Sequence, residues 1–547
     1  YNAQGWEYPK VVNSTWTSFA EAVAQECGRL EQPKGNFRVI RGDAGSSWDG
    51  WMMSVQNEHA RFRKLQRQLN DIQTLNALIP NLEISQDELD AITLDVVHLG
   101  DHAWNGFDDG TWNASIYVRR RRISSAEKRL ANVWKKIFEA KPANFADENK
   151  YAVVNTLGWT RNCELEALPE WNSSTVLHDP DTKETFYPAK FADDKLRYFI
   201  PAVPAYGARI LEKIQKENDS PVKSSVVQPL LTMRPILFIN SKEVSLQGGW
   251  KNAGEGQWSF EKLSISAYIE NSLDKNAQNL FVQISGIIPD GIYELSWLFT
   301  MPWKTCSWLM ESGGAFIKPG NISQGGDSLE GVIGSVSVAG EGLQAISTKG
   351  DTMLFAFNET GICGLGRRTT KISLPRGENE APDNDSFPYQ DSTLTEGKLY
   401  WFLLGSELNG RESYKKQMGT TSWQFHCRIQ PVDTALSAAE MYRFVCSANR
   451  PAVIIPAKLW QYGKNSALQI GNSNEVLPLG LSRRGAETEI NLFNCDKRPV
   501  QIKLEGELTK NNEIFSLNML GGNKVPVSQN QLEIPAENFQ KILLEKK

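Results

Sequence analysis

Residues 89–112 read LDAITLDVVHLGDHAWNGFDDGTW and contain two of the five histidines of the chain. His98 and His102 are four residues apart with Asp101 between them, so a continued helix would place both imidazoles on one face. The same spacing is compatible with chelation of a metal ion. A histidine packed at the end of a helix is the other interpretation, and the spacing alone favours it, because such histidines are commoner than metal ligands.

The composition is that of a globular protein with several domains. The chain has 547 residues, 40% of them hydrophobic and 22% charged, which leaves room for about three or four domains. Lys+Arg 59 and Asp+Glu 64 give a formal net charge of −5, so no overall basic field would attract nucleic acid. The one basic run, residues 119–122, is interpreted as a solvated helix face. No run of 18 apolar residues occurs, and no membrane span is predicted.

Hydrophobic periodicity divides the chain into a helical part and a β part. Residues 1–50 are too small a piece to have a core of their own and are expected to be the tail of a larger α/β unit. Residues 51–145 carry apolar residues at spacings of three and four, with a capping box at 85–88, and predict a three-helix bundle. After Pro142 the period falls to two, which predicts β domains over 150–215, 222–470 and 475–547, the second a large sandwich. The predicted class is a multidomain α+β protein.

The chain has seventeen tryptophans, and most of them, including Trp134, are expected in the core. Those in predicted strands, such as Trp297 and Trp401, are expected in the core. Others lie in predicted loops beside the helices, where indoles would offer flat apolar faces to sugar rings: Trp48, Trp51, Trp104 and Trp112.

Several segments, taken in chain order, resemble family 38 glycoside hydrolases, the α-mannosidases. Residues 42–63 (GDAGSSWDGWMMSVQNEHARFR) are similar to the segment that joins the catalytic α/β barrel of that family to its helical bundle. Residues 101–104 (DHAW) resemble the second-helix motif EHTW, 155–161 (NTLGWTR) resemble N-P-L-S-W-x-R, and 203–207 (VPAYG) resemble V-P-A-x-G-Y. Residues 417–429, with Gly419 and Phe425, resemble the strand Q-x-G … F-R-F. The resemblance covers nearly the whole chain.

The resemblance implies roles for four residues. His102 matches the zinc ligand that the bundle supplies, so zinc or another divalent cation is the implied cofactor. Trp48 matches an aromatic residue that lines the sugar pocket, and Asp101 takes a place where relatives have Glu or His. The expected substrate-binding residues are Trp48, Asp101 and Trp104, and the expected metal ligand is His102. The implied reaction is retaining hydrolysis of α-mannosidic bonds in a mannose-containing glycan.

Some features depart from the family pattern. Ala103 replaces the usual Thr, and residues 404–412 keep little of the N-N-x-W-x-T-N stretch. In that family, the nucleophile, the acid and the remaining metal ligands lie in the barrel, before the part that residues 1–547 resemble. No catalytic carboxylate is therefore identified in this sequence. We therefore expect the C-terminal portion of an α-mannosidase, with residues 1–50 as the end of its barrel and the N-terminal barrel as its missing partner. The alternative is a non-catalytic carbohydrate-binding or structural β-sandwich protein, and an in-frame barrel upstream would discriminate the two.

Overall fold

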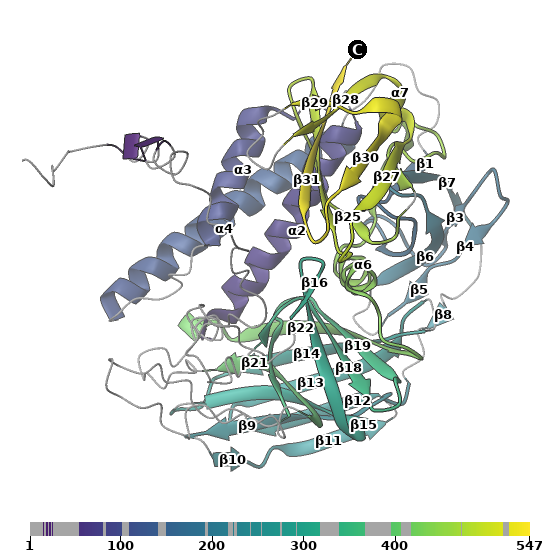
Figure 1. Cartoon of the computed structure of the whole chain (residues 1–547). Helices are drawn as coiled ribbons and strands as arrows, with labels where there is room; N and C mark the ends of the chain where they lie inside the picture. Colours follow the sequence, from purple (N-terminus) through teal and green to yellow (C-terminus); the bar gives the residue numbers. More distant parts are fainter. Residues whose placement is uncertain are drawn as a thin grey trace, which may run out of the picture. The chain divides into compact units, whose positions relative to one another are not determined.

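The computed structural model describes residues 54–79, 82, 84–100, 109–139, 149–191, 195–216, 222–223, 227–240, 242–252, 254–273, 276–291, 293–317, 338–366, 395–405, 417–471, 473–517 and 524–546, with 15, 18–19, 21–22 and 25. The chain divides into two compact units, residues 1–40 and 41–547. All elements discussed below belong to the second unit, in which helices come first and strands follow (Figure 1). Most of the predicted barrel end at 1–50 lies outside the described residues.

Three helices contain the apolar spacing of three and four: α2 (Gln56–Leu78), α3 (Gln86–Leu99) and α4 (Asp109–Glu139). Each of them contacts the other two. Helix α3 begins where the sequence predicts, because the Ser85 hydroxyl accepts a hydrogen bond from the Glu88 amide at 3.2 Å and satisfies one of the free N–H groups of the first turn. It ends at Leu99, before the cap residue Gly100.

The basic run 119–122 in α4 is only partly a solvated face, and that interpretation is wrong for Arg119. Arg119 is only 5% exposed, and its Nη1 donates to the Leu99 carbonyl at 3.2 Å. Arg120 pairs with the buried Glu58 of α2 at 2.6 Å, and Arg122 pairs with an aspartate of α3. Successive helical residues are rotated by about 100°, so a run of four surrounds the helix instead of lining one side of it.

Two small sheets follow the helices and enclose a shared core. The five-stranded sheet has the order β23-β1-β7-β3-β4, and the four-stranded sheet has the order β2-β6-β5-β8. Their core includes Val153, Cys163, Trp171 and Tyr198. The strands are β1 (Lys150–Val154), β2 (Arg161–Glu166), β3 (Thr175–His178), β4 (Thr185–Phe186), β5 (Ala189–Lys190), β6 (Leu196–Val203), β7 (Ala208–Gln215), β8 (Val222–Lys223) and β23 (Val453–Pro456).

A large antiparallel sheet of fourteen strands forms the middle of the chain. The long strand β15 pairs with β9 and β21 through residues 293–300 and with β18 through residues 306–311, so the sheet continues from one layer to the other. Trp297 and Trp401 are fully buried, which confirms their predicted place in the core. The strands are β9 (Thr232–Ile239), β10 (Lys242–Val244), β11 (Gln247–Asn252), β12 (Glu255–Phe260), β13 (Leu263–Asn271), β14 (Gln278–Gly286), β15 (Tyr293–Ser312), β16 (Ala315–Ile317), β17 (Val338–Ala339), β18 (Gly342–Ser347), β19 (Thr352–Phe357), β20 (Ile362–Leu365), β21 (Glu396–Gly405) and β22 (Ser422–Val432).

The C-terminal strands share one hydrophobic core with the helices, and α2 packs against β25. They form a three-stranded sheet, β24-β27-β30, and a five-stranded sheet, β25-β26-β31-β28-β29. The C-terminal elements are β24 (Gln469–Gly471), β25 (Val476–Arg484), β26 (Glu487–Asn494), β27 (Val500–Glu505), α7 (Glu507–Lys510), β28 (Asn512–Leu517), β29 (Val525–Pro526), β30 (Gln531–Ile534) and β31 (Phe539–Lys546). The described part of the chain also contains the 3₁₀ turns η4 (Gln417–Gly419) before β22, η5 (Ala457–Leu459) after β23, and η6 (Ser528–Asn530) before β30.

Helix α6 (Ala438–Asn449) interrupts the β region and is not predicted by the strand periodicity. A reciprocal capping box starts it, in which the Ser437 hydroxyl and the Glu440 carboxylate each accept a backbone amide. Met441 and Val445 pack against β19. No helix in the described part of the chain is long and apolar enough to cross a bilayer.

Candidate functional site

The four residues predicted to form the site, Trp48, Asp101, His102 and Trp104, lie outside the described residues. His98 is described, and it is exposed near the end of α3. Among the residues that the structure describes, no three His, Cys, Asp or Glu side chains come together as a metal site. The metal and substrate roles of these residues stay predictions.

The described residues on either side of the predicted site hold two helix ends in place. The Leu99 carbonyl at the end of α3 accepts the hydrogen bond from Arg119. The Gln56 amide at the start of α2 donates to Oε1 of Gln417 at 3.1 Å. Gln417 is 1% exposed, and its Nε2 also donates to the Tyr293 hydroxyl at 3.0 Å. The segment with Trp48 and the segment with His102 therefore connect to anchored helix ends.

The Asn155 side chain joins two of the segments that carry the family resemblance, 155–161 and 203–207. Its Nδ2 donates to three carbonyl oxygens, those of Trp159 at 2.7 Å, Val203 at 3.3 Å and Pro204 at 3.0 Å. Its Oδ1 accepts from the Leu157 amide at 3.0 Å and from Arg161 Nε at 2.9 Å. The two segments, about 40 residues apart in the sequence, thus form one buried unit.

This unit is connected to α2 and α6 through the buried Asp71. The Asp71 carboxylate accepts from Thr156 Oγ1 at 2.7 Å and from Arg450 Nη2 at 2.7 Å. Arg161 Nη1 donates to the Arg450 carbonyl at 2.6 Å, so the same residue is held from both ends. Burial acts to lower the pKa of the Arg450 guanidinium, but the nearby Asp71 carboxylate outweighs it and the pKa lies above the ordinary value.

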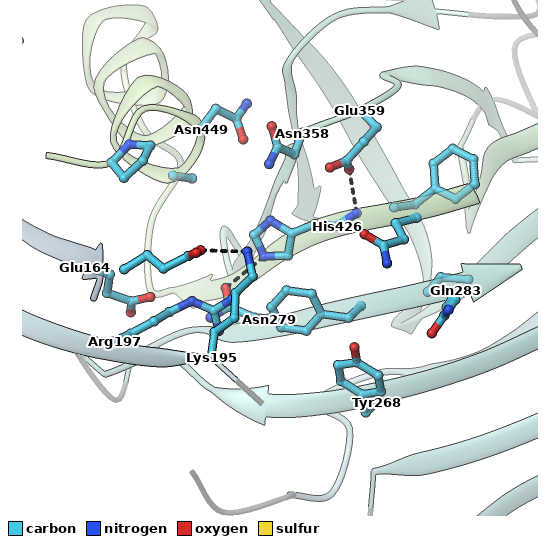
Figure 2. Close-up of a pocket in the computed structure, with 17 residues that line it drawn as sticks. Glu164, Lys195, Arg197, Tyr268, Asn279, Gln283, Asn358, Glu359, His426 and Asn449 are labelled. Atoms are coloured by element: carbon cyan, nitrogen blue, oxygen red, sulfur yellow. Dashed lines mark hydrogen bonds and ion pairs between the residues drawn. The ribbon is translucent and has the colours of Figure 1, made fainter. Parts of the chain in front are cut away.

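A pocket of about 400 Å³ opens between the large sheet and the sheet that contains β2 and β6 (Figure 2). Strands β13, β14 and β22 form one part of its lining, and β2 with the residues around β6 forms another. The turn after β19 and the end of α6 complete it. The residues used below are Glu164, Glu166, Lys195, Arg197, Tyr268, Asn279, Phe281, Gln283, Asn358, Glu359, Gln424, His426 and Asn449.

Three rings stack across neighbouring strands in this pocket. Tyr268 pairs in register with Phe281, and Phe281 pairs with His426. The ring centroids of Tyr268 and Phe281 are 5.4 Å apart, with an interplanar angle of 28°. Those of Phe281 and His426 are 4.6 Å apart, with an angle of 17°. The guanidinium of Arg197 lies over the Phe281 ring, 5.5 Å from its centroid. The stack gives the pocket a rigid apolar part beside its polar groups.

Glu359 and His426 lie next to each other, and their pKa values are shifted in opposite directions. The Glu359 carboxylate accepts the His426 backbone amide at 2.6 Å, yet burial raises the pKa of this carboxyl to about 7. Burial lowers the pKa of His426 to about 3, and the positive charges of Arg197, Arg428 and Arg67 act in the same direction. The imidazole is therefore neutral at physiological pH, with Nε2 3.4 Å from Asn279 Oδ1.

Asn449 has a buried oxygen without a partner. The residue is 4% exposed, and its Nδ2 donates to the Phe357 carbonyl at 3.0 Å. That bond fixes the orientation of the amide, because a carbonyl only accepts. The Oδ1 has no hydrogen-bond partner among the described residues, although the side chain lines the pocket (Figure 2).

Most fixed charges in the pocket are compensated. Lys195 lies 2.8 Å from Glu166, and Glu164 accepts the Leu273 amide at 2.8 Å and lies 3.7 Å from Arg428. Amides and one carboxyl of near-neutral pKa remain, so the pocket is suited to hydrogen-bonding a polar ligand of low charge.

Sequence reasoning missed this pocket because its residues come from strands and a helix end up to about 285 positions apart and form no local motif. One signal was present in the sequence. Polar and ring side chains occupy alternate positions on two neighbouring strands, namely Asn279, Phe281 and Gln283 on one and Gln424 and His426 on the other.

Two crystal structures from Enterococcus faecalis are similar to this chain. One is an α-mannosidase from strain V583 and the other is a protein of glycosyl hydrolase family 38. Each aligns with a TM-score of 0.63 and 10% sequence identity over 100% of this chain, covering 73% of the first protein and 75% of the second. No protein-family model matches the sequence, and no curated protein is similar to it. The chain therefore has a fold like that of family 38 α-mannosidases, which the sequence resemblance predicted.

Proposed function

We propose that the chain belongs to a metal-dependent retaining α-mannosidase that hydrolyses α-mannosidic bonds in glycans. The observation that carries the proposal is the alignment of the whole chain with the E. faecalis α-mannosidase at a TM-score of 0.63. The buried unit around Asn155 supports it, because segments that resemble the family also contact one another.

A retaining glycosidase needs a carboxylate nucleophile and a carboxylic acid about 5 Å apart. We propose that an α/β barrel of the same protein supplies both, as the sequence resemblance implies. In this proposal the anchored start of α2 and end of α3 position Trp48, Asp101, His102 and Trp104 against that barrel. Trp48 and Trp104 would contact the sugar with their indole faces, and Asp101 would hydrogen-bond to it.

The proposed metal is zinc or another divalent cation. The described residues do not hold such an ion by themselves, since no three ligand side chains gather among them. His102 would supply one ligand, and the barrel would supply the others. When bound, a divalent ion holds sugar hydroxyls and stabilises charge on oxygen. Because the residues that the structure describes contain no complete donor set, no catalytic step is assigned to the ion.

The experiment is a hydrolysis assay of the full-length protein with an aryl α-mannoside. His102→Ala is expected to lower turnover by about a hundredfold and to reduce bound zinc, because a metal ligand is lost. His178→Ala is the matched control, since His178 lies on β3 and is not one of the predicted site residues, and it should leave both unchanged. Treatment with a chelator should abolish activity, and added zinc should restore it.

Two results would contradict the proposal. An active enzyme that is indifferent to His102→Ala and to chelator would refute the metal assignment. A full-length protein without hydrolase activity that still binds glycans would favour the alternative, a non-catalytic carbohydrate-binding protein.

A further inference from the structure

We propose that the pocket between β14, β22, β6 and the end of α6 binds a neutral sugar unit, separately from the site predicted around His102. Nothing in this proposal requires hydrolysis. It is carried by the unpartnered oxygen of Asn449, the five amide side chains in the lining, and the size of the pocket.

The Asn449 oxygen requires a donor from the ligand. A buried acceptor without a hydrogen bond costs about 1–3 kcal/mol, so a group that donates to it gains affinity. A hydroxyl or an amine would serve. The hydrogen bond to the Phe357 carbonyl holds the amide in place, so the position of the acceptor is fixed before a ligand arrives.

The amides favour hydroxyl groups over charged groups. An amide both donates and accepts, as a hydroxyl does, and adjacent hydroxyls of a sugar ring match several amides at once. Five such side chains line the pocket: Asn279, Gln283, Asn358, Gln424 and Asn449. Asn358 Oδ1 is already used by Arg67, which leaves its amide nitrogen to donate to a ligand.

The compensated charges argue against strongly charged ligands. Lys195 is paired with Glu166, and Arg197 lies over Phe281 and 3.8 Å from Glu270, so no uncompensated cation remains to recognise a phosphate or a carboxylate. Glu359 offers a further acceptor to a ligand hydroxyl. The edges of the ring stack provide apolar contact for the C–H groups of a sugar.

The volume sets the size of the ligand. Ligand pockets range over about 300–1,000 Å³, and this one, at about 400 Å³, lies at the small end. It accommodates roughly one or two sugar rings of a longer glycan. The occupant is therefore a short neutral segment, with the remainder of the glycan outside the pocket.

The test is the binding of methyl α-D-mannopyranoside and of an α-linked mannobiose to the 547-residue chain, measured by saturation-transfer NMR and calorimetry. Gln283→Ala and Gln424→Ala replace exposed side chains at the pocket, so the fold should not change. Each is expected to weaken binding about tenfold, and Asn449→Leu at least as much. Thermal unfolding of each variant verifies that it is folded.

One matched variant separates this pocket from the rest of the surface. Gln501→Ala removes an exposed strand glutamine of the C-terminal sheet and should leave binding unchanged. Absence of sugar binding to the unaltered chain at millimolar concentration would overturn the proposal. So would binding that survives all three pocket substitutions, because the sugar would then be held elsewhere.

The outcome is independent of the test of hydrolysis. A protein that binds sugar through these glutamines but does not cleave aryl mannosides would support the pocket and refute the α-mannosidase. An active enzyme whose chain does not bind sugar in this pocket would support the α-mannosidase and refute the pocket.

Discussion

At the scale of single residues, burial shifts the pKa values of two groups in one pocket in opposite directions. It raises the pKa of the Glu359 carboxyl to about 7 and lowers the pKa of the His426 imidazole to about 3. Both groups are thereby neutral between about pH 3 and 7 in the folded protein, which suits a pocket without net charge.

The shift of Glu359 predicts a pH dependence of stability. Its pKa is about 7 in the folded chain and near 4.5 in the unfolded chain, so the folded state binds more protons between these values. Its contribution to stability therefore falls as the pH rises from 4.5 through 7. Glu359→Gln mimics the protonated form and should match the unaltered protein in melting temperature at pH 5 but exceed it at pH 8.

The two proteins are compared at the same pH, so the contributions of other titrating groups to the melting temperature cancel. One of these groups is Glu311, because burial raises its pKa to about 7 as well. Thermal unfolding at the two pH values is the measurement. An equal difference between the two proteins at pH 5 and pH 8 would show that the carboxyl titrates normally.

Single residues also show what local sequence could and could not predict. Trp297 and Trp401 were correctly placed in the core, because large rings at alternate strand positions have few other places to go. The burial of Arg119 was not predictable, since it depends on the position of the Leu99 carbonyl of another helix. Charge in the sequence indicates exposure only on average.

At the scale of elements, α2 and α6 are joined through a buried ion pair. Asp71 of α2 lies 2.7 Å from Arg450, which follows α6 in the chain, and their side chains are 11% and 9% exposed. Thr156 adds a third contact to the same carboxylate. Two side chains that are 379 positions apart in the sequence thus connect the two helices.

Asp71→Asn is predicted to lower the free energy of unfolding by about 3 kcal/mol, because it leaves the Arg450 guanidinium buried without its counter-charge. Asp90→Asn is the control, since Asp90 forms a surface pair with Arg484 at 3.7 Å with both side chains more than half exposed. It should cost less than about 1 kcal/mol. Urea denaturation measures both, and equal effects would refute a structural role for the buried pair.

Helix α6 shows how the strand periodicity can hide a helix. Its signals, Ser437 with Glu440 three positions later and Met441 four positions before Val445, were readable in the sequence. Twelve residues of helix within a long β region were overlooked because the surrounding strands set the expectation. The end of this helix carries Asn449, so the pocket could not be assembled without it.

At the scale of the whole molecule, the resemblance predicted the fold better than it predicted the site. Motifs dispersed over nearly the whole chain indicated family 38, and the same fold is found in the E. faecalis structures. The pocket, in contrast, depends on the relative placement of distant strands and one helix end, which no local pattern encodes. Trp48, Asp101, His102 and Trp104 remain predictions outside the described residues.

The most direct test of the central claim is the stereochemistry of cleavage by the full-length protein. Hydrolysis of p-nitrophenyl α-D-mannoside is followed by proton NMR of the released sugar. The proposal predicts that α-mannose is the first product, because two displacements at the anomeric carbon retain its configuration, and that the β-anomeric substrate is not cleaved. Release of β-mannose first, or no release of sugar from the α-mannoside, would contradict a retaining α-mannosidase.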